Sequence, residues 1–372
     1  MTIATSSRFS FRLAGRSEDS ALRAVLRSTS MQGKIQLSFQ REPNFFRAES
    51  AGNLESQVIA VTEESGRMAG FGCRSIRRLF VDGEDLRLGY LSGLRSLPEY
   101  RSGTLLIRGY RYLKSLHADC KVPYYITTIF DDNRLAKEVL TSGRAGLPVY
   151  HQYASIGTYL LPLYHIHTSR SDLDQFQLAP EDLPAAVNCI NRCNKHLQFA
   201  TVYGMEDFAG ESSLLPDFQS RNLFAFRRGD AITATMGLWD QHGFKQSVVA
   251  GYSNTLSLLR PASNILAKIG LTPRLPKVGG TLPYLYTVGL SATPGNLDDL
   301  IRLLEAVVRS WSRKGYAYLV VGVDHNHPLV PYLAKHAALH LSSTLYLVYW
   351  KDTAEFHMPR SGALTNVEIA TL

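Results

Sequence analysis

Cysteine is scarce in this chain of 372 residues, which contains only Cys73, Cys120, Cys189 and Cys193. Four scattered cysteines are too few for the disulfide framework of a small secreted protein. Residues 1–8 also lack the apolar core of a secretory signal. We therefore expect a reducing, cytoplasmic setting. No apolar run approaches the roughly 20 residues that a membrane-spanning helix needs, so we expect no membrane partner.

Several catalytic signatures are missing as well. The sequence contains neither G-x-S-x-G, found in lipase-type hydrolases, nor G-x-x-x-x-G-K-[ST], the phosphate loop of P-loop enzymes. The spacing of Cys189, Cys193 and His196 would let them share one side of a helix, but a zinc site normally needs four ligands. Buried helical cysteines are the simpler interpretation, and we predict no metal.

The charge is positive without being concentrated. The chain has a net charge of +8, and its densest basic cluster is Arg74, Arg77 and Arg78. Dispersed lysine and arginine usually form a solvated exterior, and they also suit a polyphosphate cofactor or an acidic surface. With no long basic stripe and no binding motif, a nucleic-acid partner is not expected. The length suits two domains, each large enough for its own core.

What the chain does have is an internal repeat. Residues 90–98 and 286–294 share Y-x-x-G-L-x-x-x-P, and residues 125–133 and 318–326 share a tyrosine followed by D-x-N. Upstream, F-x-L-A and an acidic pair recur at residues 11–19 and 176–182. Three landmarks in the same order indicate a duplicated domain. Only the first copy continues with Arg101 and Gly103; the second has Asp298 and Asp299 instead.

Periodicity and turn residues predict strands alternating with helices in both copies. In the first copy we expect strands at 9–13, 57–62, 68–80, 86–95, 124–130 and 152–161, a partly helical stretch at 35–48, and helices from 17, at 105–117 and at 134–142. In the second we expect helices at 184–196 and 297–314, with strands near 222–252 and at 284–290, 317–323 and 345–349. A Pro- and Gly-rich insertion spans roughly 257–281.

Two local features set the boundaries of these elements. Asp82-Gly83 marks a hairpin turn, because such turns require positive φ angles. The polar stretch 168–172 breaks the pattern and serves as a linker. We therefore expect domains at 1–167 and 168–352 and a C-terminal tail at 353–372.

The segment 94–104 has the properties of an anion site. It leads from a strand into an amphipathic helix, whose N-terminus offers unpaired N–H groups and a positive dipole end. Gly103 would let a phosphate approach the backbone, and Arg101 adds charge. The loop by itself fits a plain strand-to-helix turn with an exposed arginine equally well.

The order of elements resembles that of the GNAT acyltransferase family. Leu94-x-Ser-x-Pro-Glu-Tyr-Arg101, followed by Gly103, resembles that family's acyl-CoA loop. Asn133-x-x-Ala136, with Gly143 after it, resembles the segment beside the pantetheine arm. The resemblance covers most of residues 8–163 and, in weakened form, 174–350. It implies an α/β (α+β) fold of two tandem domains, each a mixed, mostly antiparallel twisted sheet flanked by helices, with a degenerate second copy.

The resemblance also implies a function. Acetyl-CoA would lie between the splayed fourth and fifth strands and give its acetyl group to an amine of a small molecule or a protein, without a metal. Backbone groups of Leu94 and Ser96 would hold the pantetheine, and Asn133 would bond near the pantetheine or adenine end. The pyrophosphate would lie on Arg101, Ser102, Gly103, Thr104 and Leu105. The oligomeric state is not indicated.

The catalytic groups are less clear from the sequence. Many family members have a tyrosine at the position of Leu140 to protonate the leaving thiolate. Tyr90 is our substitute, although a core tyrosine fits equally well; Glu42 is a candidate base, although a solvated helix acid is the simpler interpretation. A non-catalytic acyl-CoA sensor or scaffold is therefore the alternative function. Transfer to a nucleic acid, or a reaction that uses aminoacyl-tRNA, is suggested by the charge alone.

Overall fold

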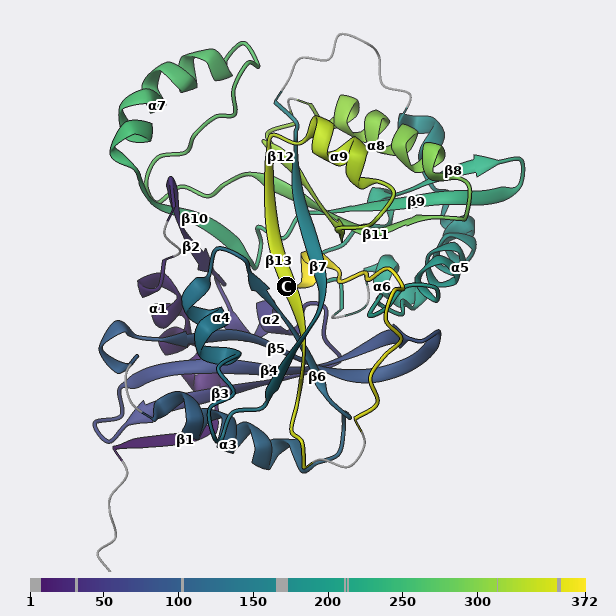
Figure 1. The fold of residues 1–372 in the computed structure, drawn as a ribbon. Helices are drawn as coiled ribbons and strands as arrows, with labels where there is room; N and C mark the ends of the chain where they lie inside the picture. The colour runs from purple at the N-terminus through teal and green to yellow at the C-terminus, as the bar shows by residue number, and fades with distance from the viewer. Residues whose placement is uncertain are drawn as a thin grey trace, which may run out of the picture.

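The computed structural model describes residues 8–30, 33–101, 104–164, 173–210, 212, 214–312, 314–352 and 356–372. One sheet of eleven strands runs through both copies, in the order β1-β3-β4-β5-β6-β13-β7-β12-β11-β9-β8 (Figure 1). The strands of the first copy are β1 (Phe9–Leu13), β2 (Ile35–Gln40), β3 (Glu55–Glu63), β4 (Met68–Val81), β5 (Glu84–Ser96), β6 (Tyr125–Phe130) and β7 (Val149–Pro162). Those of the second are β8 (Leu223–Arg228), β9 (Ala231–Trp239), β10 (Gln246–Tyr252), β11 (Tyr284–Ala292), β12 (Tyr318–Asp324) and β13 (Leu339–Tyr349).

Helices cover this sheet. They are α1 (Asp19–Ser28), α2 (Phe45–Ser50), α3 (Leu105–His117), α4 (Arg134–Leu140), α5 (Leu183–Asn194), α6 (Met205–Ala209), α7 (Asn254–Ala267), α8 (Leu297–Trp311) and α9 (Val330–His336). Most strand pairs are antiparallel, while β5 with β6 and β11 with β12 are parallel. The predicted fold class, a mixed and mostly antiparallel sheet flanked by helices, is confirmed.

Local sequence signals account for several of these elements. The hairpin between β4 and β5 turns at Asp82 and Gly83, with φ angles of 53° and 85°. Such left-handed angles at both central residues match the strand twist, which is why Asp-Gly is favoured there. Helix α3 has the bounds predicted for it, and buries Tyr110 and Leu113 along one face.

The last strands of the two copies are exchanged. Strand β13 pairs with β6 on one side and with β7 on the other, and β7 pairs in turn with β12. Each copy's sheet is thus continued by the final strand of the other copy. The division into domains at residue 167 stays a prediction, and the expected linker at 168–172 lies outside the described residues.

A second contact joins the copies away from the main sheet. Strand β2 forms a two-stranded antiparallel sheet with β10. At its end, the side-chain amide of Gln246 donates to the backbone carbonyl of Glu42 and its oxygen accepts from the Glu42 backbone N–H, at 2.9 and 3.0 Å. The stretch 35–48, expected to be partly helical, contains β2 and the start of α2.

The segment 356–372, expected as a tail, packs into the body of the protein. Val367 and Ala370 are buried, and the Arg77 guanidinium donates to the Thr371 carbonyl at 2.7 Å. Gly322 on β12 lies so close to the Ile369 side chain that a Cβ atom would overlap it. Apolar positions at 367, 369 and 370 give this segment a buried face.

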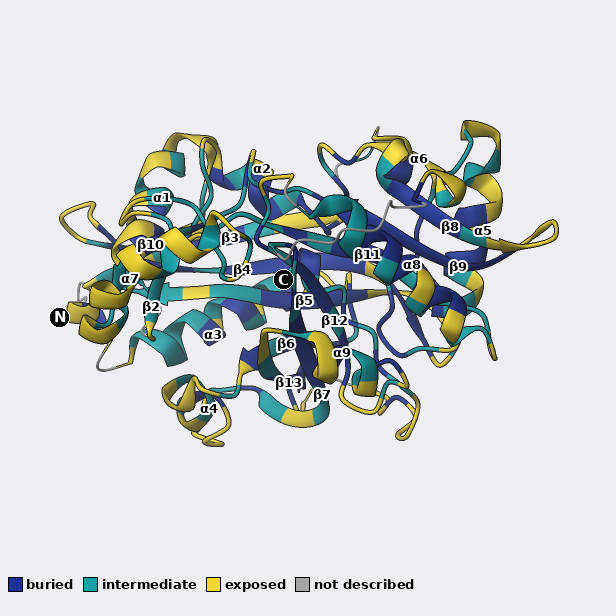
Figure 2. Ribbon diagram, turned by 90° about the horizontal axis from the view of Figure 1, so that it is seen from above, coloured by how far each residue is buried: buried dark blue, intermediate teal, exposed yellow. Residues whose placement is uncertain are grey.

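Burial is concentrated in the strands and the inner faces of the helices (Figure 2). Helix α7 is the exception among the longer helices, because none of its residues is buried. Within the described residues, no helix is long and apolar enough to cross a membrane.

Candidate functional site

Strands β5 and β6 pair over only a short stretch. Within these two fully described strands the parallel register covers Gly89 with Tyr125 and Tyr90 with Ile126, and nothing further along. Past this point the Thr127 hydroxyl donates to the Leu91 carbonyl at 2.7 Å. A register shift on the β4 side accompanies Gly93, whose φ of +63° requires a residue without a Cβ. The divergence matches the splay that the resemblance implies.

Beyond β5 the chain leads to the N-terminus of α3. A short 3-10 helix, Pro98–Tyr100, ends in Arg101, which is exposed. Thr104 precedes the helix without capping it through its side chain. First-turn N–H groups of a helix that lack such a cap remain available to an anion. Ser102 and Gly103 lie outside the described residues.

The other residues predicted to bind the donor lie along the same path. Leu94, 47% exposed, and Ser96 are on the diverging part of β5, and Leu105 opens α3 half-buried. Asn133 caps α4, where its side chain accepts from the Ala136 backbone N–H at 3.2 Å. The cap occupies one acceptor atom and leaves the amide's donors for other partners. Its contact with a cofactor stays a prediction.

In the second copy, the chain's own groups occupy the corresponding positions. Gly289, with φ of +59°, repeats the geometry of Gly93, but its N–H donates to the Glu368 carboxylate at 3.2 Å. The Tyr203 hydroxyl donates to the same carboxylate at 2.9 Å. Burial raises the pKa of Glu368 to about 7.

The N-terminus of α8 carries acidic side chains in its first turn. Asp299 is fully buried in its first turn and accepts two hydrogen bonds from Arg228 at 2.8 Å, and one from Thr233 at 2.7 Å. The carboxylate places a negative charge in the first turn of α8, where it would repel a phosphate at the position that corresponds to the anion site predicted in the first copy. These contacts explain physically why the second copy has lost the features of an anion site.

A small charged cavity adjoins β5 at Ser92. It has a volume of about 10 Å³, enough for about one water molecule. Its lining residues come from both copies: Arg41, Ala48, Glu49, Ala51, Asn53, Arg77, Ser92, Lys245, Thr371 and Leu372. The Glu49 carboxylate pairs with Arg41 and accepts a hydrogen bond from Ser92 at 3.4 Å.

Lys245 is the least expected member of this cavity. It lies between β9 and β10, so the second copy supplies a titratable group to the first. Burial and the nearby charges of Arg41 and Arg77 lower the pKa of Lys245 to about 7. A lysine with such a pKa is partly a neutral amine at neutral pH, and can accept a proton.

Tyr90 lies on β5, where its pairing with β6 ends, and is 4% exposed. The Arg77 guanidinium stacks 3.7 Å from its ring centre, and its hydroxyl lies 3.4 Å from the Thr128 hydroxyl on β6. Burial raises the pKa of Tyr90, so the phenol keeps its proton in the neutral range. Both interpretations of this residue, core tyrosine and proton donor, fit that environment, and the catalytic role stays a prediction.

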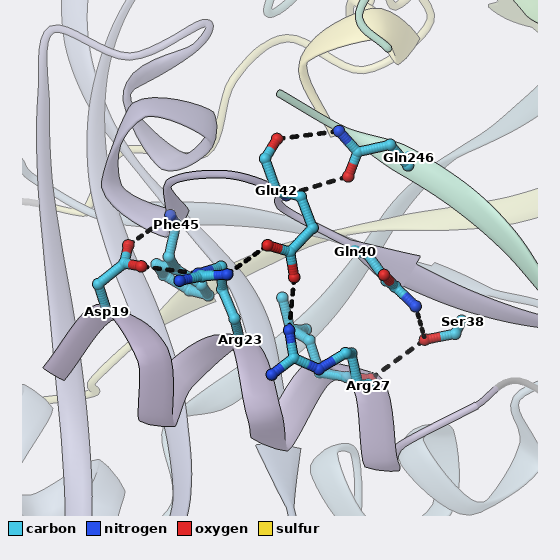
Figure 3. Close-up of polar contacts among 9 residues, drawn as sticks. Asp19, Arg23, Arg27, Ser38, Gln40, Glu42, Phe45 and Gln246 are labelled. Carbon is cyan, nitrogen blue, oxygen red and sulfur yellow. Dashed lines mark hydrogen bonds and ion pairs between the residues drawn. The ribbon is translucent and has the colours of Figure 1, made fainter. Parts of the chain in front are cut away.

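Glu42 is held by arginines of α1 and does not line the cavity; Figure 3 shows its polar contacts. Its carboxylate pairs with Arg23 and with Arg27, the latter at 2.6 Å, and Arg23 also pairs with Asp19 on α1. The adjacent residue, Arg41, lines the cavity instead. The structure therefore does not bring Glu42 together with Tyr90, and a catalytic role for Glu42 stays a prediction.

Two further observations concern ligands. Among the described residues, no group of three or more His, Cys, Asp or Glu side chains is arranged to hold a metal ion. A larger open groove of about 660 Å³ lies near the C-terminal ends of α3 and α4. It contains none of the residues that the sequence predicts for donor binding or catalysis.

No family model matches the sequence, and no curated protein matches it significantly. Solved structures do resemble the fold. Saccharomyces cerevisiae N-myristoyltransferase with bound myristoyl-CoA is 11% identical, with a TM-score of 0.60 over 97% of this chain and 85% of that one. A GCN5-related N-acetyltransferase from Sphaerobacter thermophilus is 11% identical, with a TM-score of 0.56 over 94% of this chain and 98% of that one.

A third similar structure is a GCN5-related glucosamine N-acetyltransferase region of a fungal multi-domain GH3 β-N-acetylglucosaminidase. It is 11% identical, with a TM-score of 0.60 over 93% of this chain and 38% of that one. These similarities extend over nearly the whole chain, so the protein has the GNAT fold, in the two-copy form that the repeat predicts.

Proposed function

We propose that this protein is an acyl-CoA-dependent N-acyltransferase that binds acetyl-CoA in the first copy and transfers the acetyl group to an amine. The observation that carries the proposal is the divergence of β5 from β6 after two paired residues, leading to the N-terminus of α3, which the Thr104 side chain does not cap. The corresponding positions in the second copy hold Glu368 and Asp299. One donor site per chain follows from this asymmetry.

The residues present fit an acyl-CoA donor. The diverging part of β5 carries Leu94, which is exposed, and Ser96, which is half-buried, and their backbone groups suit the pantetheine amides. Arg101 and the first turn of α3 suit a pyrophosphate, because a helix N-terminus combines unpaired N–H donors with a positive dipole end. The donor would supply the thioester. The protein would supply orientation of the two reactants and proton transfer.

The reaction needs a base and an acid. An amine attacks the thioester carbonyl once its ammonium proton has been removed, and the carbon–sulfur bond breaks to leave a thiolate that takes up a proton. Lys245, with its pKa of about 7, supports the first step, while Glu42 is already paired with two arginines. Tyr90 holds its phenolic proton at the point where β5 diverges from β6, which supports the second.

A non-catalytic acyl-CoA sensor or scaffold is the second candidate. The observation in its favour is the cavity beside Ser92, which has room for about one water molecule and would have to open for an acceptor. Leu140, where many GNAT enzymes have a tyrosine, is buried in the core. A sensor would bind acyl-CoA without releasing free CoA when amines are added.

Turnover distinguishes the two functions. We would measure free CoA thiol from acetyl-CoA and from myristoyl-CoA over a panel of small amines and peptides. Acetyl-CoA turnover with at least one amine is expected. Tyr90→Phe should lower kcat by about 100-fold, a typical loss for a proton donor. The matched control is Tyr286→Phe, the equivalent residue of the second copy, which should leave kcat unchanged. Equal effects of the two substitutions would remove Tyr90 from the mechanism.

A further inference from the structure

Helix α7 turns its apolar side toward solvent. Leu258 is 82% exposed and Ile265 is 65% exposed. Seven of the sixteen large exposed apolar side chains among the described residues lie between positions 258 and 278: Leu258, Leu259, Ile265, Leu266, Ile269, Leu271 and Val278. A surface helix normally buries its apolar stripe, and a concentration of exposed apolar side chains marks an interaction site.

The exposed side chains form one stripe. Positions 258, 262 and 265 follow the three- and four-residue spacing of a single helix face, 259 and 266 lie beside them, and Ile269 follows just after the helix ends. The opposite face makes the contacts with the protein. The Asn264 side chain exchanges hydrogen bonds with the backbone of Leu275 at 2.8 and 3.1 Å, and Arg260 donates to the same carbonyl at 3.3 Å. Polar contacts therefore fix the helix with its apolar stripe outward.

The charge of the surrounding segment has one sign. From Gln241 to Leu297 the sequence contains no Asp or Glu. Within residues 254–282 it contains Arg260, Lys268, Arg274 and Lys277, and the last three are exposed. Basic residues beside an exposed apolar stripe are the features by which an amphipathic helix binds at a lipid–water interface containing anionic lipids.

We propose that α7 and the following segment to residue 282 form a docking site for an anionic membrane surface. A second copy of this chain is a poorer occupant, because a symmetric contact would place two uncompensated basic patches against each other. An anionic bilayer both covers the stripe and neutralises the cations. The helix projects from the body beside β10, so it can lie on a surface without rearrangement of the main sheet (Figure 1).

This inference departs from the sequence-based expectation of no membrane partner. That expectation rested on the lack of a spanning run, whereas lying on a surface requires only one apolar face of a helix. The segment was noticed in the sequence for its proline and glycine, which concealed the helical spacing of its apolar residues.

Vesicle co-sedimentation of the full chain tests the proposal. We expect binding to phosphatidylcholine vesicles that contain phosphatidylglycerol, weaker binding to phosphatidylcholine alone, and loss of the difference at high salt. Leu258→Ser/Ile265→Ser should lower the partition coefficient by about tenfold or more, because it removes apolar contact with the bilayer. Leu86→Ser/Met205→Ser, at exposed positions elsewhere, is the matched control and should bind like the wild type.

Thermal unfolding of each variant shows that it is folded, and all four positions are already exposed to solvent. Failure of the wild type to sediment with anionic vesicles would overturn the proposal, as would equal losses in the two double variants. Light scattering of the free protein provides a further check. A stable dimer that Leu258→Ser/Ile265→Ser dissociates would assign the stripe to a second copy and refute membrane docking.

Discussion

Glu368, which occupies the position beside Gly289 in the second copy, offers a quantitative test of that contact. Its carboxyl accepts hydrogen bonds from Tyr203 and from the Gly289 backbone, and burial raises its pKa from 4.5 to about 7. Between these two values the folded protein holds a proton that the unfolded chain has released. The free energy of unfolding must therefore fall as the pH rises through this window.

The substitution Glu368→Gln isolates this effect. Glutamine resembles the protonated carboxyl, because its oxygen can still accept both hydrogen bonds while the group stays neutral. Relative to the variant, the wild type should lose about 2 to 3 kcal/mol of unfolding free energy between pH 5 and pH 8, as a shift of this size implies. The variant should be the more stable protein at pH 8.

Urea denaturation of both proteins at pH 5, 6, 7 and 8 provides the measurement. Taking the difference between them removes the contributions of other groups, including His117 and His327, whose lowered pKa values give the opposite slope. Exposed Glu138→Gln is the control and should show no pH-dependent difference from the wild type. A difference between Glu368→Gln and the wild type that does not change with pH would refute a buried, neutral carboxyl at the Gly289 bulge.

Two further predictions concern packing and charge. Gly322→Ala should lower the free energy of unfolding by about 1 to 3 kcal/mol, a typical penalty for overpacking, because the new Cβ would overlap the Ile369 side chain. Gly15→Ala, where the new Cβ would have room, is the control in the same urea assay. Lys245→Met removes a lysine whose pKa is lowered to about 7 in the folded protein. Above that pH the folded wild type has released the Lys245 proton, whereas the unfolded chain still binds it. Relative to the variant, the wild type should therefore gain about 2 kcal/mol between pH 7 and pH 9, and a flat difference would contradict a buried Lys245.

Local patterns predicted the elements that depend on local physics. Helix α3 was predicted at its observed bounds, because Leu105, Tyr110 and Leu113 follow one amphipathic face. The turn at Asp82-Gly83 was predicted because few other dipeptides tolerate its backbone angles. The repeat identified Gly93 and Gly289 as matching positions of the two copies, while their positive φ angles and the register shifts beside them appear only in the structure.

Long-range placement could not be predicted in the same way. Strands β7 and β13 have similar apolar patterns, and nothing in either sequence specifies that β13 lies between β6 and β7. Lys245 reaches the first copy through the pairing of β10 with β2, and Glu368 reaches Gly289 through the packed segment after 356. No local signal distinguishes either residue from a solvated charge. The sequence-based prediction of the site therefore lacked both ionisable groups.

The most direct test of the central claim is calorimetric titration of acetyl-CoA into the wild type, Arg101→Ala/Gly103→Glu and Arg87→Ala. The account predicts one site per chain, lost in the double variant and retained in Arg87→Ala, a control at an exposed arginine on the far part of β5. Two sites per chain would contradict the claim that Glu368 and Asp299 prevent the second copy from binding a donor. No binding to the folded wild type would contradict the assignment of an acyl-CoA cleft between β5 and β6.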